Sequence, residues 1–175
     1  MTTSMEPCKL GVKIFVANPE VVDIHEFIPV FQGWIEQQKI KGHLLIDVHD
    51  YSHVEKGPGV LLVAHEGNFS MDEANGRLGL VYCRKQSVAN PLKTAFEAAQ
   101  AACRSLEAEP KLNGVKFPTG EFLVFSNDRL LAPNTAGARQ QLEPVIKHAF
   151  AGATVTLAPQ SADPRERLAF VVHLR

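Results

Sequence analysis

Short apolar runs rich in β-branched residues alternate along the chain with longer stretches whose apolar residues recur every three or four positions. The short runs predict β-strands, because strands bury such residues in brief, nearly continuous segments. The expected strands cover residues 10–17, 43–50, 59–66, 78–84, 121–126, 153–158 and 167–174. The polar residues 67–76 are expected to form a loop that closes on Asn75-Gly76.

The stretches with helical periodicity predict three helices. In the first, Phe27, Phe31 and Trp34 share one face, Asp23 and Glu26 have the spacing of a capping box, and Gly42 ends the helix. The second is expected over about residues 92–108 and the third over about residues 135–151. A core formed by these apolar faces against a sheet follows.

These elements predict an α+β fold in a single domain of residues 9–175, after a disordered tail of residues 1–8. The sheet is expected to be mostly antiparallel, with seven strands and three helices in the order βαββ-βα-βαββ. Residues 27–31 echo residues 142–146, and residues 61–65 echo residues 169–173. The two echoes suggest an internal duplication of a βαββ unit, with a ligand cleft between the halves.

Composition narrows the function classes. The 175 residues are 45% hydrophobic, which excludes general disorder, and 18 Lys and Arg against 19 Asp and Glu argue against a nucleic-acid partner. Neither a signal peptide nor an apolar run long enough to span a bilayer is visible, so we expect a cytoplasmic protein with no membrane partner. Three distant cysteines suit reduced thiols, and nucleotide-loop, hydrolase and CxxC motifs are missing, so no cofactor is expected.

The first candidate site is the run of residues 47–53. Alternate residues of a strand share a face, so Asp47, His49, Tyr51 and His53 would line one side. These side chains suit a catalytic or ligand-binding face, and imidazoles with a carboxylate also suit a metal. The alternative is a polar strand face that simply meets solvent.

The second candidate is His65 with Glu66, at the end of an expected strand. A strand end holds such a pair firmly while the adjoining loop admits a substrate, which suits general acid and base groups. The pattern is not the HExxH of zinc proteases, because residue 69 is Phe69. The alternative is a packed His65 beside a solvated Glu66.

The third candidate is the loop of residues 127–134, which contains Asn127, Asp128 and Arg129 before an expected helix start. The Arg129 guanidinium suits a carboxylate or phosphate, and the N–H groups of the helix start could hold the same anion. The alternative is an Asx turn at Asn127 and Asp128 with a solvated or Asp-paired Arg129.

Four runs resemble a family of small uncharacterised bacterial proteins with no assigned activity. They are residues 27–31 (FIPVF), 44–54 (LLIDVHDYSHV), 57–66 (GPGVLLVAHE) and 127–134 (NDRLLAPN). The resemblance implies a bacterial, cytoplasmic origin and assigns no catalytic residue.

The leading hypothesis is a domain that binds a small anion in a cleft lined by Asp47, His49, His65, Glu66 and Arg129. Its extension is acid–base chemistry on that anion, with His65 as the base. The alternative is a non-enzymatic homodimer that uses an open sheet face. A further alternative, a metal-dependent enzyme, requires His49, His53 and His65 to converge.

Overall fold

The computed structural model describes residues 9–175, so the predicted tail of residues 1–8 lies outside the described chain. Its strands are β1 (Leu10–Phe15), β2 (Leu45–Tyr51), β3 (Gly59–Ala64), β4 (Gly67–Asp72), β5 (Gly79–Arg84), β6 (Glu121–Ser126), β7 (Val155–Pro159) and β8 (Ala169–Leu174). Its α-helices are α1 (Phe27–Gln37), α2 (Pro91–Glu107) and α3 (Ala136–Ala149). The predicted α+β class is confirmed.

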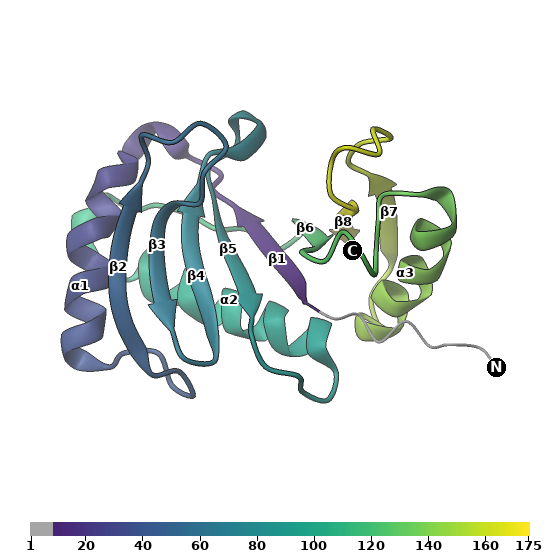
Figure 1. Ribbon diagram of the computed structural model, residues 1–175. Helices are drawn as coiled ribbons and strands as arrows, with labels where there is room; N and C mark the ends of the chain where they lie inside the picture. The colour runs from purple at the N-terminus through teal and green to yellow at the C-terminus, as the bar shows by residue number, and fades with distance from the viewer. Residues whose placement is uncertain (1–8) are drawn as a thin grey trace.

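All eight strands form one antiparallel sheet in the order β2-β3-β4-β5-β1-β6-β8-β7 (Figure 1). The prediction of seven strands was wrong, because the expected polar loop of residues 67–76 contains β4. Phe69 and Met71 are fully buried on one face of β4, while Ser70 and Asp72 point to the other. The alternation of apolar and polar residues is therefore the signature of a strand, which the polar composition concealed.

The three α-helices pack on one face of the sheet. Their buried side chains share a single core with strand residues such as Val12, Leu80 and Val124. A smaller cluster on the opposite face consists of strand residues alone, including Phe15, Leu123 and Phe125. We call this second face the open face. None of the helices in residues 9–175 is both long and apolar enough to span a bilayer.

The helix boundaries follow local chemistry. Asp23 and Glu26 form the predicted capping box, which closes a 3-10 turn at Ile24–Glu26 directly before α1. The helix ends at Gln37, because the next residue, Gln38, takes a left-handed conformation with φ of 45°, and so it stops before the predicted Gly42. Helices α2 and α3 lie close to their predicted ranges, and the Thr135 side chain caps α3.

The internal duplication remains unconfirmed. β1 and β6 are central neighbours, and each is followed by a helix and then by an outer strand. However, β8 lies directly beside β6, whereas β4 and β5 separate β3 from β1. The strands of the echo at residues 61–65 and 169–173 are both second from an edge, but they differ in their inner neighbours, so the topology leaves the duplication unconfirmed.

Candidate functional site

Strand β2 carries the first predicted group on an outer edge of the sheet. Asp47, His49 and Tyr51 pair with β3 residues that belong to the open face. His49 Nε2 lies 3.5 Å from Asp47 Oδ2, and the His49 and Tyr51 rings are 5.9 Å apart between centroids. All three side chains are exposed, and His53 lies in the turn that follows. The geometry fits the solvent-facing alternative.

The turn between β3 and β4 holds the second pair. His65 is exposed. Glu66 is turned towards the segment just before β2, where its Oε2 accepts a hydrogen bond of 2.8 Å from the Leu44 N–H. That bond lowers the pKa of Glu66, more than any other contact does. Glu66 therefore anchors the start of β2 and does not orient His65 by a described hydrogen bond.

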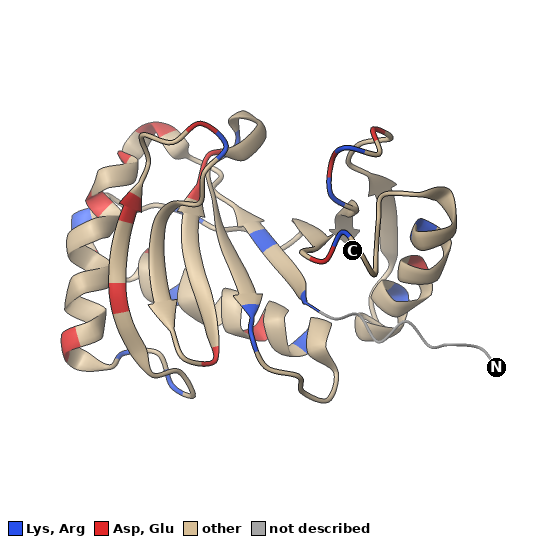
Figure 2. Ribbon diagram, viewed as in Figure 1, with Lys and Arg blue, Asp and Glu red and all other residues tan. Residues whose placement is uncertain are grey.

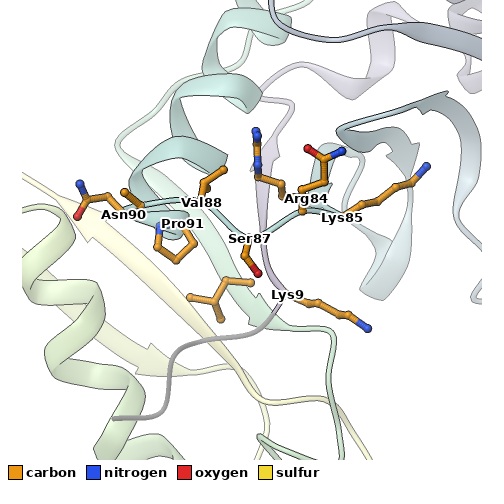
Figure 3. Close-up of a pocket in the computed structure, with 10 residues that line it drawn as sticks. Lys9, Arg84, Lys85, Ser87, Val88, Asn90 and Pro91 are labelled. Carbon is orange, nitrogen blue, oxygen red and sulfur yellow. The ribbon is translucent and has the colours of Figure 1, made fainter.

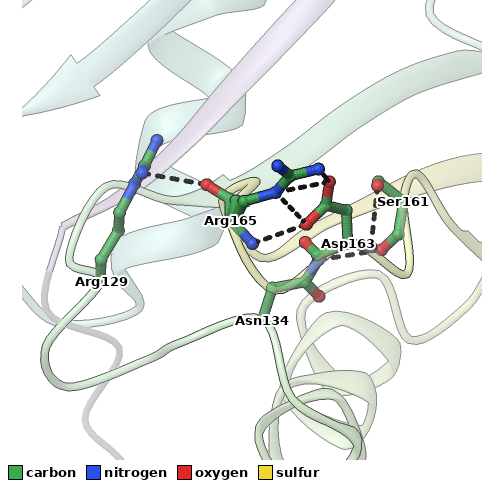
Figure 4. Close-up of polar contacts among 5 residues, drawn as sticks. All are labelled: Arg129, Asn134, Ser161, Asp163 and Arg165. Carbon is green, nitrogen blue, oxygen red and sulfur yellow. Dashed lines mark hydrogen bonds and ion pairs between the residues drawn. The ribbon is translucent and has the colours of Figure 1, made fainter.

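The loop after β6 holds the third group. Asp128 Oδ1 accepts from the N–H groups of Leu130 and Leu131, each at 3.0 Å, which is the predicted alternative of an Asx turn. Arg129 donates from Nη1 to the carbonyl of Arg165 at 3.0 Å, and so it braces the loop between β7 and β8 (Figure 4). Arg129 therefore has a structural contact with this loop, and the rest of its side chain is exposed.

These groups do not share one cleft. Strands β3, β4, β5 and β1 separate β2 from β6, so Asp47 and His49 lie about 24 Å from the strand that leads to Arg129, at about 4.8 Å per strand. The structure therefore does not bring these residues together, and the expectation of one cleft lined by Asp47, His49, His65, Glu66 and Arg129 was wrong. The expected convergence of His49, His53 and His65 also fails, because residues 9–175 contain no group of three or more His, Cys, Asp or Glu placed to hold a metal.

A pocket of about 600 Å³ lies elsewhere, where β1 begins and the chain passes from β5 into α2 (Figure 3). Its lining is Lys9, Leu10, Arg84, Lys85, Gln86, Ser87, Val88, Ala89, Asn90 and Pro91. Three of these residues are cationic and none is acidic. Figure 2 shows the same contrast, since the charged bands on β2 are acidic and those at the adjoining ends of β5 and β1 are basic. We call this cavity the basic pocket.

The first turn of α2 adds to its positive potential. Asn90 precedes the helix in a left-handed conformation with φ of 50°, and its side chain makes no capping hydrogen bond. The free N–H groups and the dipole of a helix N-terminus favour an anion. Helix α2 has 17 residues, so its dipole is fully developed.

Arg84 connects the pocket to a buried polar group that the sequence did not single out. Its Nε atom is buried without a hydrogen-bond partner among the described residues. Next to it, Tyr82 is fully buried, and its hydroxyl lies 2.6 Å from Nε2 of His43. Burial raises the pKa of Tyr82, which Arg84 opposes, and burial lowers the pKa of His43. Tyr82 and His43 therefore face Arg84 as neutral groups at neutral pH.

A second charged cluster lies at the centre of the open face. Lys13 Nζ contacts Asp72 Oδ1 at 2.5 Å, with 2% of the lysine side chain and 10% of the aspartate side chain exposed. Lys13 reaches Asp72 by crossing β5 at Gly79, where a Cβ would approach the lysine Cε to 2.8 Å. Burial lowers the pKa of Lys13, and Asp72 opposes this shift. We call these two residues the buried ion pair.

Two arginines stack beside the buried ion pair. The Arg77 guanidinium lies 3.6 Å from the centre of the Phe15 ring, and that of Arg167 lies 3.6 Å from the centre of the Phe125 ring. Arg77 is also bound to Glu121 at 2.6 Å. This cluster therefore matches cations with carboxylates or aromatic faces, unlike the basic pocket.

Comparison with known proteins gives no further constraint: no family model, curated protein or solved structure matches the chain.

The sequence did hold a signal for the basic pocket. Arg84 ends an expected strand, Lys85 follows it, and both come just before the Asn90-Pro91 helix start, where the positive end of a helix dipole favours an anion. Lys9 could not be added from the sequence, because its place beside Lys85 depends on the pairing of β1 with β5.

Proposed function

We propose that the protein binds a small organic anion in the basic pocket. The observation that supports the proposal is the charge of its lining: Lys9, Arg84 and Lys85 with no Asp or Glu. Cations without counter-charges repel one another, and a bound anion removes that cost. Binding of a small anion was expected from the sequence, but at Arg129.

The chemistry of the lining favours phosphate or carboxylate groups on a carbon skeleton. Arg84 offers a planar fork of donors, and the positive end of the α2 dipole lies at Pro91, which lines the pocket but has no N–H to donate. The volume of about 600 Å³ exceeds the need of an inorganic ion, and Leu10, Val88 and Pro91 supply apolar wall. An organic phosphate or polycarboxylate fits both features.

Acid–base catalysis, where it accompanies binding, is proposed to use His43 in place of His65. A neutral imidazole accepts a proton, and the lowered pKa keeps His43 neutral near pH 7. Its Nε2 already contacts the Tyr82 hydroxyl beside Arg84. The proposal also keeps the expected bacterial, cytoplasmic setting.

Calorimetry with sulfate, pyrophosphate and citrate tests the proposal. In the Arg84→Gln/Lys85→Gln variant we expect the affinity for the best anion to fall at least about tenfold, because two charge-assisted contacts are lost. Arg104→Gln is the matched control, since Arg104 is an exposed arginine in the last turn of α2, at the opposite end of that helix from the pocket. Unchanged affinity in the double variant, or no binding of any of the three anions, contradicts the proposal.

A homodimer is the second candidate, and one observation favours it. Of the six exposed large apolar residues in the described range 9–175, four lie on or beside β2: Leu44, Ile46, Tyr51 and Val54. Simple edge pairing is opposed, because Gln38 bonds both the N–H and the carbonyl of Leu45, and Asp47 Oδ1 accepts from the Val48 N–H. Sedimentation at several concentrations tests it, and a strict monomer excludes it.

A further inference from the structure

Two leucines project from the loop after β6. Leu130 is 94% exposed and Leu131 is 62% exposed, so they are the two most exposed large apolar side chains in residues 9–175. Adjacent apolar side chains as exposed as these mark a place where a partner surface can bury them. We call Leu130 and Leu131 the leucine tip.

The loop that carries the leucine tip is fixed on both sides. Asp128 holds the backbone N–H groups of both leucines, and the Ala132 N–H donates to the Asp128 carbonyl at 2.9 Å. After the tip, the buried Asn134 donates to the carbonyls of Ser161 and Asp163, each at 2.9 Å (Figure 4). The hydrogen bonds of the loop therefore hold both leucines in an exposed position. Contact with a partner would cost little conformational entropy, because the loop is already ordered.

The leucine tip lies past the same end of the sheet as the basic pocket. The Asn127 N–H donates to the carbonyl of Lys9, which lines that pocket, at 3.0 Å. β1 begins beside the end of β6 on one side and the end of β5 on the other. The apolar projection and the cationic cavity are thus neighbours at one end of the molecule.

The charges around the tip complement an anionic surface. Lys9 and Arg129 are exposed cations beside it, since the Lys9 carbonyl accepts from the Asn127 N–H and Arg129 directly precedes Leu130, and Lys85 is a third exposed cation at the same end of the sheet. Two of the nearby carboxylates already have partners: Asp128 accepts from the N–H groups of its own turn, and Asp163 binds Arg165 at 2.8 Å. Glu166 is the exception, because it is exposed. Apolar insertion with cations at the rim is the combination by which proteins bind the surface of a bilayer.

We propose that the leucine tip inserts into the surface of a membrane that contains anionic phospholipids, and that the basic pocket takes a lipid phosphate headgroup. The inference rests on the proposed function, because it names the source of the anion. A bilayer accepts two leucines without a matching cavity, whereas a stable protein interface needs about 1,200–2,000 Å² in total, far more than two side chains supply. The expectation of no membrane partner came from the lack of a signal peptide and of an apolar run long enough to span a bilayer, and neither bears on a local surface patch.

Co-sedimentation with lipid vesicles tests the inference. Phosphatidylcholine vesicles that also contain phosphatidylglycerol are expected to bind the protein, and phosphatidylcholine vesicles at least about tenfold less. Leu130→Ser/Leu131→Ser is expected to weaken vesicle binding at least about tenfold and to leave sulfate binding in solution unchanged. Ile46→Ser is the matched control, because Ile46 is 52% exposed on the distant strand β2, and it is expected to bind as the original protein does.

The outcomes separate the two proposals. Sulfate binding without vesicle binding overturns the lipid inference and leaves the proposed function standing, while failure of both overturns both. Equal binding of the serine variant, or equal binding to neutral vesicles, also overturns the lipid inference. So does concentration-dependent self-association that the serine variant loses, since the tip would then contact a second copy of the chain.

Discussion

Two clusters of charged residues lie on the central strands, one on the open face and one at the strand ends, and they differ in how their charges are matched. On the open face, Lys13 is buried together with Asp72, and Arg77 has Glu121 as its partner. In the basic pocket, Lys9, Arg84 and Lys85 surround a cavity with no acidic residue. The comparison teaches that charge alone does not mark a binding site. Charges matched inside the fold have no free partner to offer a ligand, whereas charges left unmatched beside a cavity do, and the proposed anion binding depends on that difference.

The largest expected effect comes from breaking the buried ion pair. Asp72→Asn leaves the Lys13 ammonium buried without a counter-charge, and such losses cost about 3–5 kcal/mol of unfolding free energy. Urea unfolding measures the change. The double variant Lys13→Met/Asp72→Asn is expected to recover most of the loss, because no unmatched charge then remains. A single variant as stable as the original protein would mean that the ion pair has no structural role.

The glycine that lets Lys13 reach Asp72 gives the next largest effect. A Cβ at Gly79 would lie 2.8 Å from the Ile14 carbonyl oxygen, which belongs to the paired backbone of β1 and has no room to move. Gly79→Ala is therefore expected to lower the unfolding free energy by about 1–3 kcal/mol in the same urea assay.

Gly33→Ala is the matched control for that variant. A Cβ at Gly33, inside α1, meets nothing within 4 Å, so alanine is expected to stabilise by about 0.5–1 kcal/mol. Equal effects at the two glycines would show that the path of Lys13 across β5 places no demand on residue 79.

The sequence predicted the fold class, the three helices and seven of the eight strands, because each has a clear hydrophobic period. It missed β4, in which polar side chains of the open face alternate with Phe69 and Met71. Local sequence patterns indicate the face on which a residue lies, but they do not indicate which residue of another strand it contacts. For this reason Asp72 was assigned to a polar loop, although it pairs with Lys13 across the sheet.

The site was harder to predict than the fold, since a site depends on which strands become neighbours. Asp47, His49 and Tyr51 share a face as expected, but their strand lies at an edge, far from Arg129. Lys9 and Arg84 are 75 positions apart in the chain and meet only because β1 pairs with β5. His43 and Tyr82 meet only through the packing around Phe69.

A smaller effect is expected from pH at His43. Its folded pKa lies below the ordinary value of 6.5, so the unfolded chain binds more protons between those two values. Stability contributed by neutral His43 is therefore present above pH 6.5 and is lost as pH falls towards the folded pKa. In His43→Gln this part of the decline is expected to disappear, as thermal unfolding from about pH 7 to about pH 5 would measure. Identical pH profiles for the two proteins would contradict the burial of a neutral His43 beside Tyr82.

The smallest expected effect on stability comes from the basic pocket and completes the comparison. Lys85 is exposed and has no carboxylate partner among the described residues, but its Nζ donates to the Ala64 carbonyl at 2.8 Å. Loss of that hydrogen bond and relief of repulsion from Arg84 and Lys9 oppose each other in Lys85→Gln, so the unfolding free energy is expected to change by no more than about 0.5 kcal/mol. Added sulfate should stabilise the original protein more than the variant, because an anion bound only to the folded state raises stability, and more so where all three cations remain. If sulfate stabilises both proteins equally, Lys85 does not contact the anion, and the unmatched charge of the pocket would need another explanation.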